Sequence, residues 1–217
     1  MPHTFFDEAA ATWDDDPTKL ARSRLIADAI ARAVPLDGVR DALEYGCGTG
    51  QVTWALADRL DRVVLADASP GMLAVLGERL QARPEHDRAR FEPRLLDLTR
   101  DSLPPASVDL IYTSLALHHV PDVPLVLRRF RAALRPGGHV AIADLDRDVH
   151  GHFHRHSHGD DFDGHHGFDR DALAADLAAA GFAPPAFETV TTLTKIVDDE
   201  EMEFPVFLAV AQAAGTV

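Results

Sequence analysis

The stretch that decides the fold is "ALEYGCGTGQV", residues 42–52. It begins as a short apolar run, typical of a buried strand, and runs into three glycines, Gly46, Gly48 and Gly50. Glycine is needed where the chain turns sharply and where the backbone approaches a ligand with no Cβ in the way. A helical pattern follows from Gln51, so the stretch predicts a strand, a ligand-binding loop and a helix in succession.

The spacing of the glycines bears on which cofactor the loop would hold. A dinucleotide-binding loop requires a third glycine three residues after the second, and that position is Gln51. This spacing disfavours an NAD-type oxidoreductase, which stays the second hypothesis. Asp67 and Asp97 end later strand patterns, where carboxylates can accept hydrogen bonds from ribose hydroxyls or an adenine amino group. Each acid alone is equally well explained as a turn or cap residue.

Strand and helix patterns alternate along the rest of the chain. Helical patterns cover residues 17–34, 51–60, 69–83, 121–134 and 169–181, and strand patterns cover 39–46, 62–67, 89–98, 107–117, 139–146, 187–197 and 203–213. This alternation predicts a parallel sheet covered on both faces, and the last two strands suggest an antiparallel hairpin at its edge. We therefore expect one α/β domain over residues 1–217: a Rossmann-like, doubly wound, mostly parallel seven-stranded sheet with an antiparallel C-terminal hairpin strand.

Composition excludes several classes of function. The chain has 217 residues and a formal net charge of −14, so a nucleic-acid backbone or an anionic membrane is not expected as its main partner. One cysteine, Cys47, rules out an internal disulfide and favours a reducing compartment. No signal-peptide pattern and no apolar run of membrane-spanning length is present in the sequence. We expect a soluble, cytoplasmic protein, and oligomeric state is beyond what the sequence predicts.

Taken together, these motifs resemble a known family. The runs "ALEYGCGTG", "VVLADASPGML", "LLDL", "SVDLIYTSLALHHVPD" and "ALRPGGHVAIAD" look like those of class I S-adenosylmethionine-dependent methyltransferases, in the group that includes ubiquinone- and menaquinone-biosynthesis enzymes. The similarity covers residues 40–145 and is looser at both ends. It implies S-adenosylmethionine as cofactor and methyl transfer as the reaction.

The resemblance also implies a set of cofactor-binding positions. The methionine and ribose portions would be held at Glu44, Gly46, Gly48 and Gly50, the ribose hydroxyls at Asp67, and the adenine by Ala68, Met72, Asp97 and Leu98, with Ser114 close by. Leu115, His118 and His119 would lie at the mouth of the active site. Residues 1–36, which include Phe5, Phe6 and Trp13, are predicted to form a helical lid over the cofactor, with a core-anchoring arm as the alternative.

Residues 146–168 are predicted to form a histidine-rich loop inserted after the fifth strand. The run "VHGHFHRHSHGDDFDGHHGF", residues 149–168, holds seven of the twelve histidines. Three interpretations stay open: a solvated loop or lid with one or two functional histidines, a specific divalent metal site, or incidental surface. A softer resemblance, in the "FH" and "HHGF" pairs, singles out His154 and His166. The candidate metal ligands are His152, His154, Asp163 and His166.

The leading hypothesis is methyl transfer to a small-molecule acceptor by in-line displacement. An acceptor that carries a proton at working pH needs a general base, and histidine suits that role because its ordinary pKa lies near neutrality. His119, His154 and His166 are therefore the candidate catalytic residues. A third hypothesis is a metal-binding or sensory protein on a methyltransferase fold without turnover. The sequence does not identify the acceptor.

Overall fold

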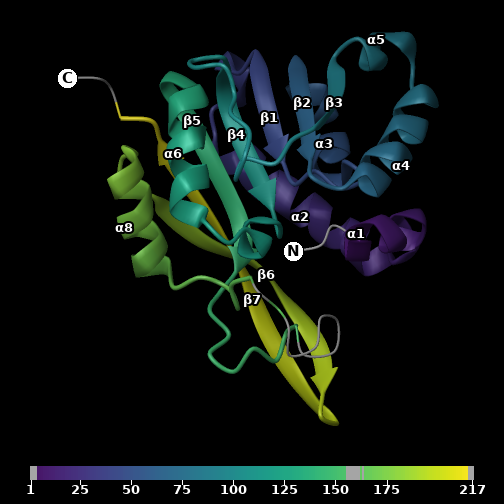
Figure 1. Ribbon diagram of the computed structural model, residues 1–217, viewed down its shortest axis with the longest axis vertical. Coiled ribbons are helices and arrows are strands. Elements are labelled where there is room, and N and C mark those ends of the chain that lie inside the picture. The colour runs from purple at the N-terminus through teal and green to yellow at the C-terminus, as the bar shows by residue number, and fades with distance from the viewer. Residues whose placement is uncertain (1–3, 155–161, 163, 215–217) are drawn as a thin grey trace.

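The computed structural model describes residues 4–154, 162 and 164–214, and its centre is a seven-stranded sheet (Figure 1). The strands are β1 Asp41–Tyr45, β2 Arg62–Asp67, β3 Phe91–Leu95, β4 Val108–Ser114, β5 Leu134–Leu145, β6 Ala186–Val197 and β7 Glu200–Gln212. Their order across the sheet is β3-β2-β1-β4-β5-β7-β6. Neighbours among β1 to β5 pair in parallel, whereas β7 is antiparallel to β5 and to β6. The predicted fold class is confirmed.

Helices cover both faces of the sheet. The α-helices are α1 Thr4–Ala9, α2 Pro17–Ala33, α3 Gln51–Leu56, α4 Pro70–Gln81, α5 Glu85–Arg88, α6 Val123–Ala133 and α8 Arg170–Ala180, and the 3₁₀ helices are η1 Ala10–Asp15, η2 Leu36–Gly38, η3 Ala57–Arg59 and η4 Leu117–His119. Apolar side chains of α2, α3 and α4 form one core cluster with one side of the strands. Those of α6 and α8 form a second cluster with the other side. No helix among the described residues has the length and apolarity needed to span a membrane.

Local sequence signals explain where the central helices begin and end. Helix α4 starts at Pro70 behind Ser69, whose hydroxyl accepts a hydrogen bond from the Met72 amide at 3.1 Å. Helix α8 starts behind Asp169, which accepts from two amides of the first turn, and ends at Gly181 with φ +94°. The start at Ser69 and Pro70 and the end at Gly181 agree with the helical patterns over residues 69–83 and 169–181.

One segment differs from the expected boundaries, and a proline is accommodated inside another expected strand. The run "RPGG", between the expected helix over residues 121–134 and the expected strand over 139–146, lies within β5, where the pairing with β4 shifts between Val108 and Leu110 and Gly137 takes φ +81°. The extra residues of this bulge are absorbed without ending the strand. Pro93 is accommodated in β3 because β3 is the edge strand beside β2, where one side of its backbone needs no ladder partner.

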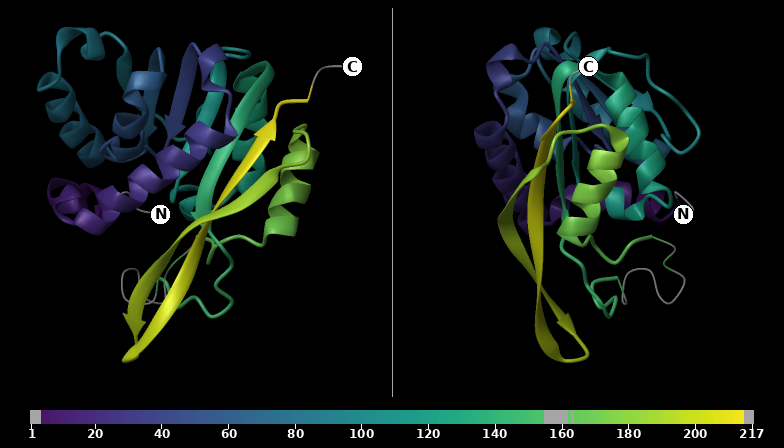
Figure 2. Two further views of the ribbon diagram at one scale, coloured as in Figure 1. Left: turned by 180° about the vertical axis from the view of Figure 1, so that it is seen from behind. Right: turned by 90° about the vertical axis from the view of Figure 1, so that its left-hand side faces the viewer.

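The hairpin of β6 and β7 extends well beyond the rest of the sheet, and the chain that follows β5 runs beside it (Figure 2). Lys195 of β6 donates a hydrogen bond to the Phe153 carbonyl at 2.8 Å and lies 3.6 Å from the centre of the Phe153 ring. Phe153 also packs edge-on against Phe204 of β7. The hairpin thus holds the first part of the histidine-rich segment in place.

Candidate active site

The glycine loop between β1 and α3 is folded back on the end of β2. Gly46, Gly48 and Gly50 all have positive φ, between +52° and +83°. The amides of Gly46 and Cys47 donate to the carbonyl of Ala66, which closes the turn. A Cβ on Gly46 would overlap the Cβ of Ala116, so the loop that follows β4 approaches so closely only because residue 46 is glycine.

The two acids at the ends of β2 and β3 are each fixed by neighbouring donors. Asp67 accepts from the Gly48 amide at 2.7 Å and from the Ser69 amide at 2.9 Å. Asp97 accepts from the amide and the hydroxyl of Thr99. Both carboxylates are thus oriented at the carboxyl edge of the sheet, the edge at which open α/β sheets bind their ligands.

A cavity of about 290 Å³ opens at this edge, close to the lower end of the ~300–1,000 Å³ usual for small-molecule sites. Of the predicted cofactor and catalytic positions, those that line it are Glu44, Gly46, Gly48, Asp67, Ala68, Met72, Asp97, Ser114 and His119. Gly50 instead lies at the N-terminus of α3, and Leu98 is fully buried in the second core cluster. The structure therefore brings most of the predicted positions around one space.

Glu44 is buried beneath the glycine loop. Its carboxylate accepts a hydrogen bond from Thr53, whose hydroxyl also contacts the hydroxyl of Tyr112. Burial raises the pKa of Glu44 to about 8, with a smaller contribution from the negative charge of Asp67. A protonated Glu44 is the form that this apolar environment favours at neutral pH.

The N-terminal elements α1 and η1 pack over the cavity through two aspartates. Asp7 accepts from the Ser69 hydroxyl at 2.5 Å and from the Gly71 amide at 2.8 Å, at the start of α4. Asp14 accepts from the Thr49 hydroxyl at 2.7 Å and from the Gln51 side chain, on the glycine loop. These bonds attach the segment directly to the elements that form the cavity.

Three further side chains of the N-terminal region face the cavity: Phe6, Trp13 and Arg22. The Phe6 ring meets the ring of His119 edge-on, with centroids 5.0 Å apart. Arg22 of α2 has a buried Nε with no hydrogen-bond partner among the described residues. A buried guanidinium donor at a cavity wall is suited to an anionic group of a ligand.

His118 and Asp144 form a buried pair at the ends of the adjacent strands β4 and β5. His118 Nδ1 lies 2.6 Å from Asp144 Oδ1, and the His118 amide donates to Asp144 Oδ2 at 3.2 Å. Both side chains are almost fully buried. Asp144 was not among the sequence candidates; the signal that could have found it is an acid at the carboxyl end of β5, next to the histidines that follow β4.

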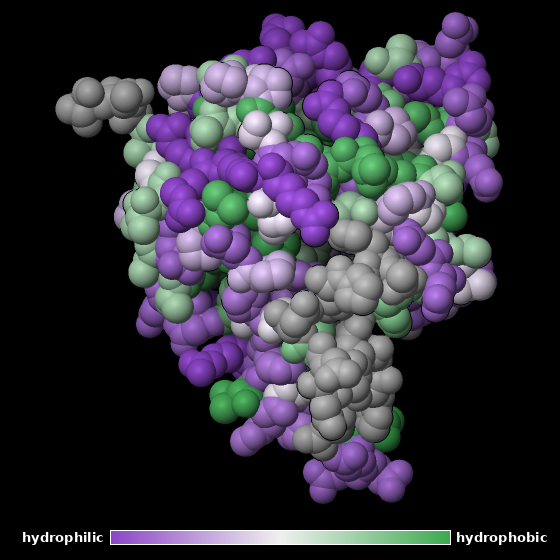
Figure 3. Space-filling view, in the orientation of Figure 1, coloured by the Kyte–Doolittle hydropathy of each residue, from purple (hydrophilic) through white to green (hydrophobic). Residues whose placement is uncertain are grey.

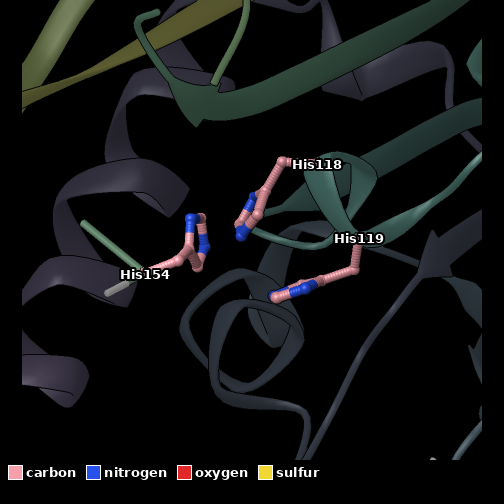
Figure 4. A group of neighbouring side chains, drawn as sticks. All are labelled: His118, His119 and His154. Carbon is pink, nitrogen blue, oxygen red and sulfur yellow. The ribbon is translucent and has the colours of Figure 1, made fainter. Parts of the chain in front are cut away.

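The imidazoles of His118, His119 and His154 converge (Figure 4). One nitrogen from each lies within 4.8 Å of the other two, and among the described residues this is the group of histidine, cysteine, aspartate and glutamate side chains close enough to hold one metal ion. His119 lines the cavity, while His118 and His154 are buried behind it.

The other candidate residues of the histidine-rich loop do not belong to the three-histidine group. His166 is exposed, and its ring centroid is 5.8 Å from that of His154. His152 stacks on His150 at 5.3 Å. Asp163 lies outside the described residues. Of the four predicted metal ligands, His154 is the one that the structure places in the three-histidine group.

The chain belongs to the methyltransferase domain family, whose sequence profile it matches over residues 19–184. It is 30% identical over 146 residues to 27-O-demethylrifamycin SV methyltransferase of Amycolatopsis mediterranei. The aligned region covers 67% of this chain and 51% of the relative. It is 40% identical over 123 residues to trans-aconitate 2-methyltransferase of Variovorax paradoxus, and this alignment covers 56% of this chain and 44% of the relative. The chain thus spans about half the length of the curated relatives that it matches. The predicted family is confirmed.

A solved structure with the same fold comes from the complex between the Haloferax volcanii Trm112 methyltransferase activator and a methyltransferase. The TM-score is 0.77 at 20% sequence identity, and the match covers 96% of this chain and 97% of that one. At that identity the similarity concerns the fold, and it agrees with the sheet order described above.

Proposed function

We propose that this chain catalyses S-adenosylmethionine-dependent methyl transfer to a small-molecule acceptor. The observation that carries the proposal is the cavity between the glycine loop and the oriented carboxylates of Asp67 and Asp97, covered by α1 and η1. The names of the relatives, which describe methyltransferases of a rifamycin and of trans-aconitate, support a small-molecule acceptor.

The residues around the cavity suit each part of this cofactor. The glycine backbone leaves room for the ligand to approach, and the Asp67 and Asp97 carboxylates provide acceptors for ribose hydroxyls and the adenine amino group. Arg22 provides a buried donor for the carboxylate of the methionine portion. Glu44 provides a carboxyl group, and a positive charge nearby would stabilise the ionised form of that group.

When bound, the cofactor would supply a methyl group on a sulfonium, and an acceptor lone pair would take the methyl carbon as the C–S electron pair stays on sulfur. The protein's main contribution is position, worth roughly 7–11 kcal/mol in effective-molarity terms. Phe6, Trp13 and His119, which line the cavity, would face the acceptor and exclude water. His119 is placed to accept the proton of a protic acceptor such as a phenol or an alcohol.

Within residues 1–36, α1 and η1 (residues 4–15) are proposed to act as a lid, whereas α2 packs into the core through Ile26, Ala29 and Ile30 and is proposed to be the anchoring arm. Asp7 and Asp14 bond to α4 and to the glycine loop, so opening this segment would expose the cavity. The partners Ser69, Thr49 and Gln51 are buried beneath this segment, and the bonds are polar rather than apolar, which fits a segment that closes after the ligand has entered.

The test is a comparison of ligands followed by an acceptor screen. S-adenosylmethionine and S-adenosylhomocysteine should bind in calorimetry and raise the melting temperature, whereas NAD should do neither. Turnover is then measured as S-adenosylhomocysteine formed from carboxylates, phenols, thiols and carbon acids. Stabilisation by NAD alone would overturn the proposal in favour of an oxidoreductase, and cofactor binding without turnover on any acceptor would favour the sensory alternative.

A further inference from the structure

We propose that His118, His119 and His154 form a site for one divalent transition-metal ion beside the cofactor cavity. Their ligand nitrogens lie within 4.8 Å of one another, although the residues come from two separate segments, η4 and the chain after β5. Figure 4 shows the three imidazoles directed toward a shared space.

The Asp144 carboxylate orients His118 in the way that metal-binding histidines are oriented. A carboxylate 2.6 Å from Nδ1 accepts a hydrogen bond from that nitrogen, so the lone pair of the neutral ring is on Nε2. A carboxylate in this position behind a ligating histidine fixes its tautomer and the orientation of its ring. The amides of His118 and Leu145 also donate to Asp144, which keeps the carboxylate itself in place.

The segment that carries His154 is held against η4 by contacts of its own. Phe162 stacks on the His154 ring, with centroids 3.9 Å apart and planes 12° from parallel. The His165 amide donates to the His118 carbonyl at 2.7 Å, and a Cβ on Gly164 would overlap that carbonyl oxygen. The protein thus assembles the three ligands by its own packing, and binding requires little reorganisation.

The donor set selects the kind of metal. Imidazole nitrogens suit Zn²⁺, Fe²⁺, Co²⁺, Ni²⁺ and Cu²⁺, whereas Mg²⁺ and Ca²⁺ prefer oxygen ligands. Zinc–nitrogen bonds are about 2.0–2.1 Å long, which puts two ligand nitrogens of a tetrahedral ion roughly 3.3 Å apart. Rotations that move each nitrogen by about 1 Å would therefore close the group around an ion.

A three-histidine site leaves a coordination position for an exogenous ligand. His119 lines the cavity, so that position would face the acceptor side of the pocket. Resting on the proposed function, we infer that the ligand is the acceptor itself, bound through a thiolate or an oxygen anion. A divalent ion held by neutral imidazoles would lower the pKa of such a group, whose proton would be released to solvent, and would fix its lone pair. With an ion bound, His119 would serve as a ligand and the ion would replace it in activating the acceptor.

The first test uses Co²⁺ as a spectroscopic probe of the whole protein after a chelator wash. We expect one Co²⁺ per chain with the intense visible absorption of a tetrahedral site. His119→Ala and His154→Ala should each weaken Co²⁺ binding at least tenfold, and Asp144→Asn by about 10–100-fold, as is typical when the hydrogen-bond partner of a metal ligand is changed. Because His119 is partly exposed, its variant retains the buried core.

The control variant is His86→Ala, on the exposed helix α5 away from the cavity, which should bind Co²⁺ and S-adenosylhomocysteine as the wild type does. His152→Ala and His166→Ala test the other candidate ligands. Loss of Co²⁺ binding in these two but not in His119→Ala and His154→Ala would overturn the assignment. The assignment would also be overturned if wild-type protein bound S-adenosylhomocysteine but no Co²⁺. If the protein bound Co²⁺ but neither form of the cofactor, the metal site would be supported and the proposed function would be refuted.

Discussion

At the scale of single residues, Asp67 both orders the loops around the cavity and lines the cavity itself. Its carboxylate holds the glycine loop through the Gly48 amide and the start of α4 through the Ser69 amide, and it lines the cavity. Under the proposed function, Asp67 would both order the loop and bind the ligand, and so would couple the shape of the cavity to its occupant.

Replacing this carboxylate should separate cofactor binding from folding. We expect Asp67→Ala to weaken S-adenosylmethionine binding tenfold or more, because a hydrogen bond to a charged group contributes ~1.5–3 kcal/mol. Calorimetric titration measures the effect. Asp61→Ala, an exposed acid before β2, is the matched control and should bind normally. An unchanged affinity in Asp67→Ala would argue against the cofactor assignment.

Glu44 predicts a pH dependence of stability. Its pKa is raised to about 8 in the folded protein against an ordinary value of 4.5, so between these pH values the folded chain keeps a proton that the unfolded chain has lost. The stability that this proton supplies is therefore complete at low pH and declines as the pH rises toward 8, with a slope approaching ~1.4 kcal/mol per pH unit.

The measurement is denaturant unfolding of wild type and Glu44→Gln across that pH range. Because the glutamine side chain cannot ionise, the variant should gain stability relative to wild type as the pH rises. Parallel pH profiles for the two proteins would show that Glu44 titrates normally in the folded state.

Some positions around the cavity could be predicted from the sequence, and some side-chain partnerships could not. Gly46 and Asp67 were predictable because their positions follow from strand ends and from turns that only glycine makes easily. The partnership of His118 with Asp144 was not, because the two residues are 26 positions apart and meet only when β4 and β5 are adjacent. Side-chain pairs of this kind depend on sheet order rather than on local pattern.

At the scale of elements, boundaries were predicted well where a cap or turn residue marks them. Gly181 ends α8 and Pro70 begins α4, as the sequence indicates. The placement of α1 and η1 over the cavity was expected only by resemblance, since it depends on long-range bonds from Asp7 and Asp14. No periodicity of the segment itself encodes those partners.

Asp14 gives a test of the N-terminal segment as a lid. Asp14→Ala removes the bonds to Thr49 and Gln51 and the ion pair with Arg79. We expect roughly tenfold weaker cofactor binding, from two hydrogen bonds of about 0.5–1.5 kcal/mol each, and faster proteolysis near residues 4–16. In wild type the cofactor should slow that cleavage.

The control for this experiment is Asp15→Ala, which changes an exposed acid one residue further along. It should leave both affinity and proteolysis as in wild type. If S-adenosylhomocysteine protects residues 4–16 no better than it protects the rest of the chain, the segment is a fixed arm rather than a lid.

At the scale of the whole molecule, charge is the dominant property. The formal net charge is −14, and hydrophilic residues spread over much of the face in Figure 3 with apolar residues between them. A field of this sign attracts cations and repels anions within about a Debye length of the surface. The field should strengthen the binding of S-adenosylmethionine, which carries one net positive charge, and leave that of S-adenosylhomocysteine, which carries none, nearly unaffected.

Salt should therefore separate substrate from product. Raising the ionic strength from about 0.02 M to 0.2 M should weaken S-adenosylmethionine binding roughly twofold to threefold and leave S-adenosylhomocysteine nearly unchanged, because screening acts on net charge. Parallel titrations at four salt concentrations give the two slopes, with the product as the internal control. Equal slopes would show that the field of the whole molecule contributes nothing to recognition of the sulfonium, and that the discrimination arises within the cavity, at Glu44 and its neighbours.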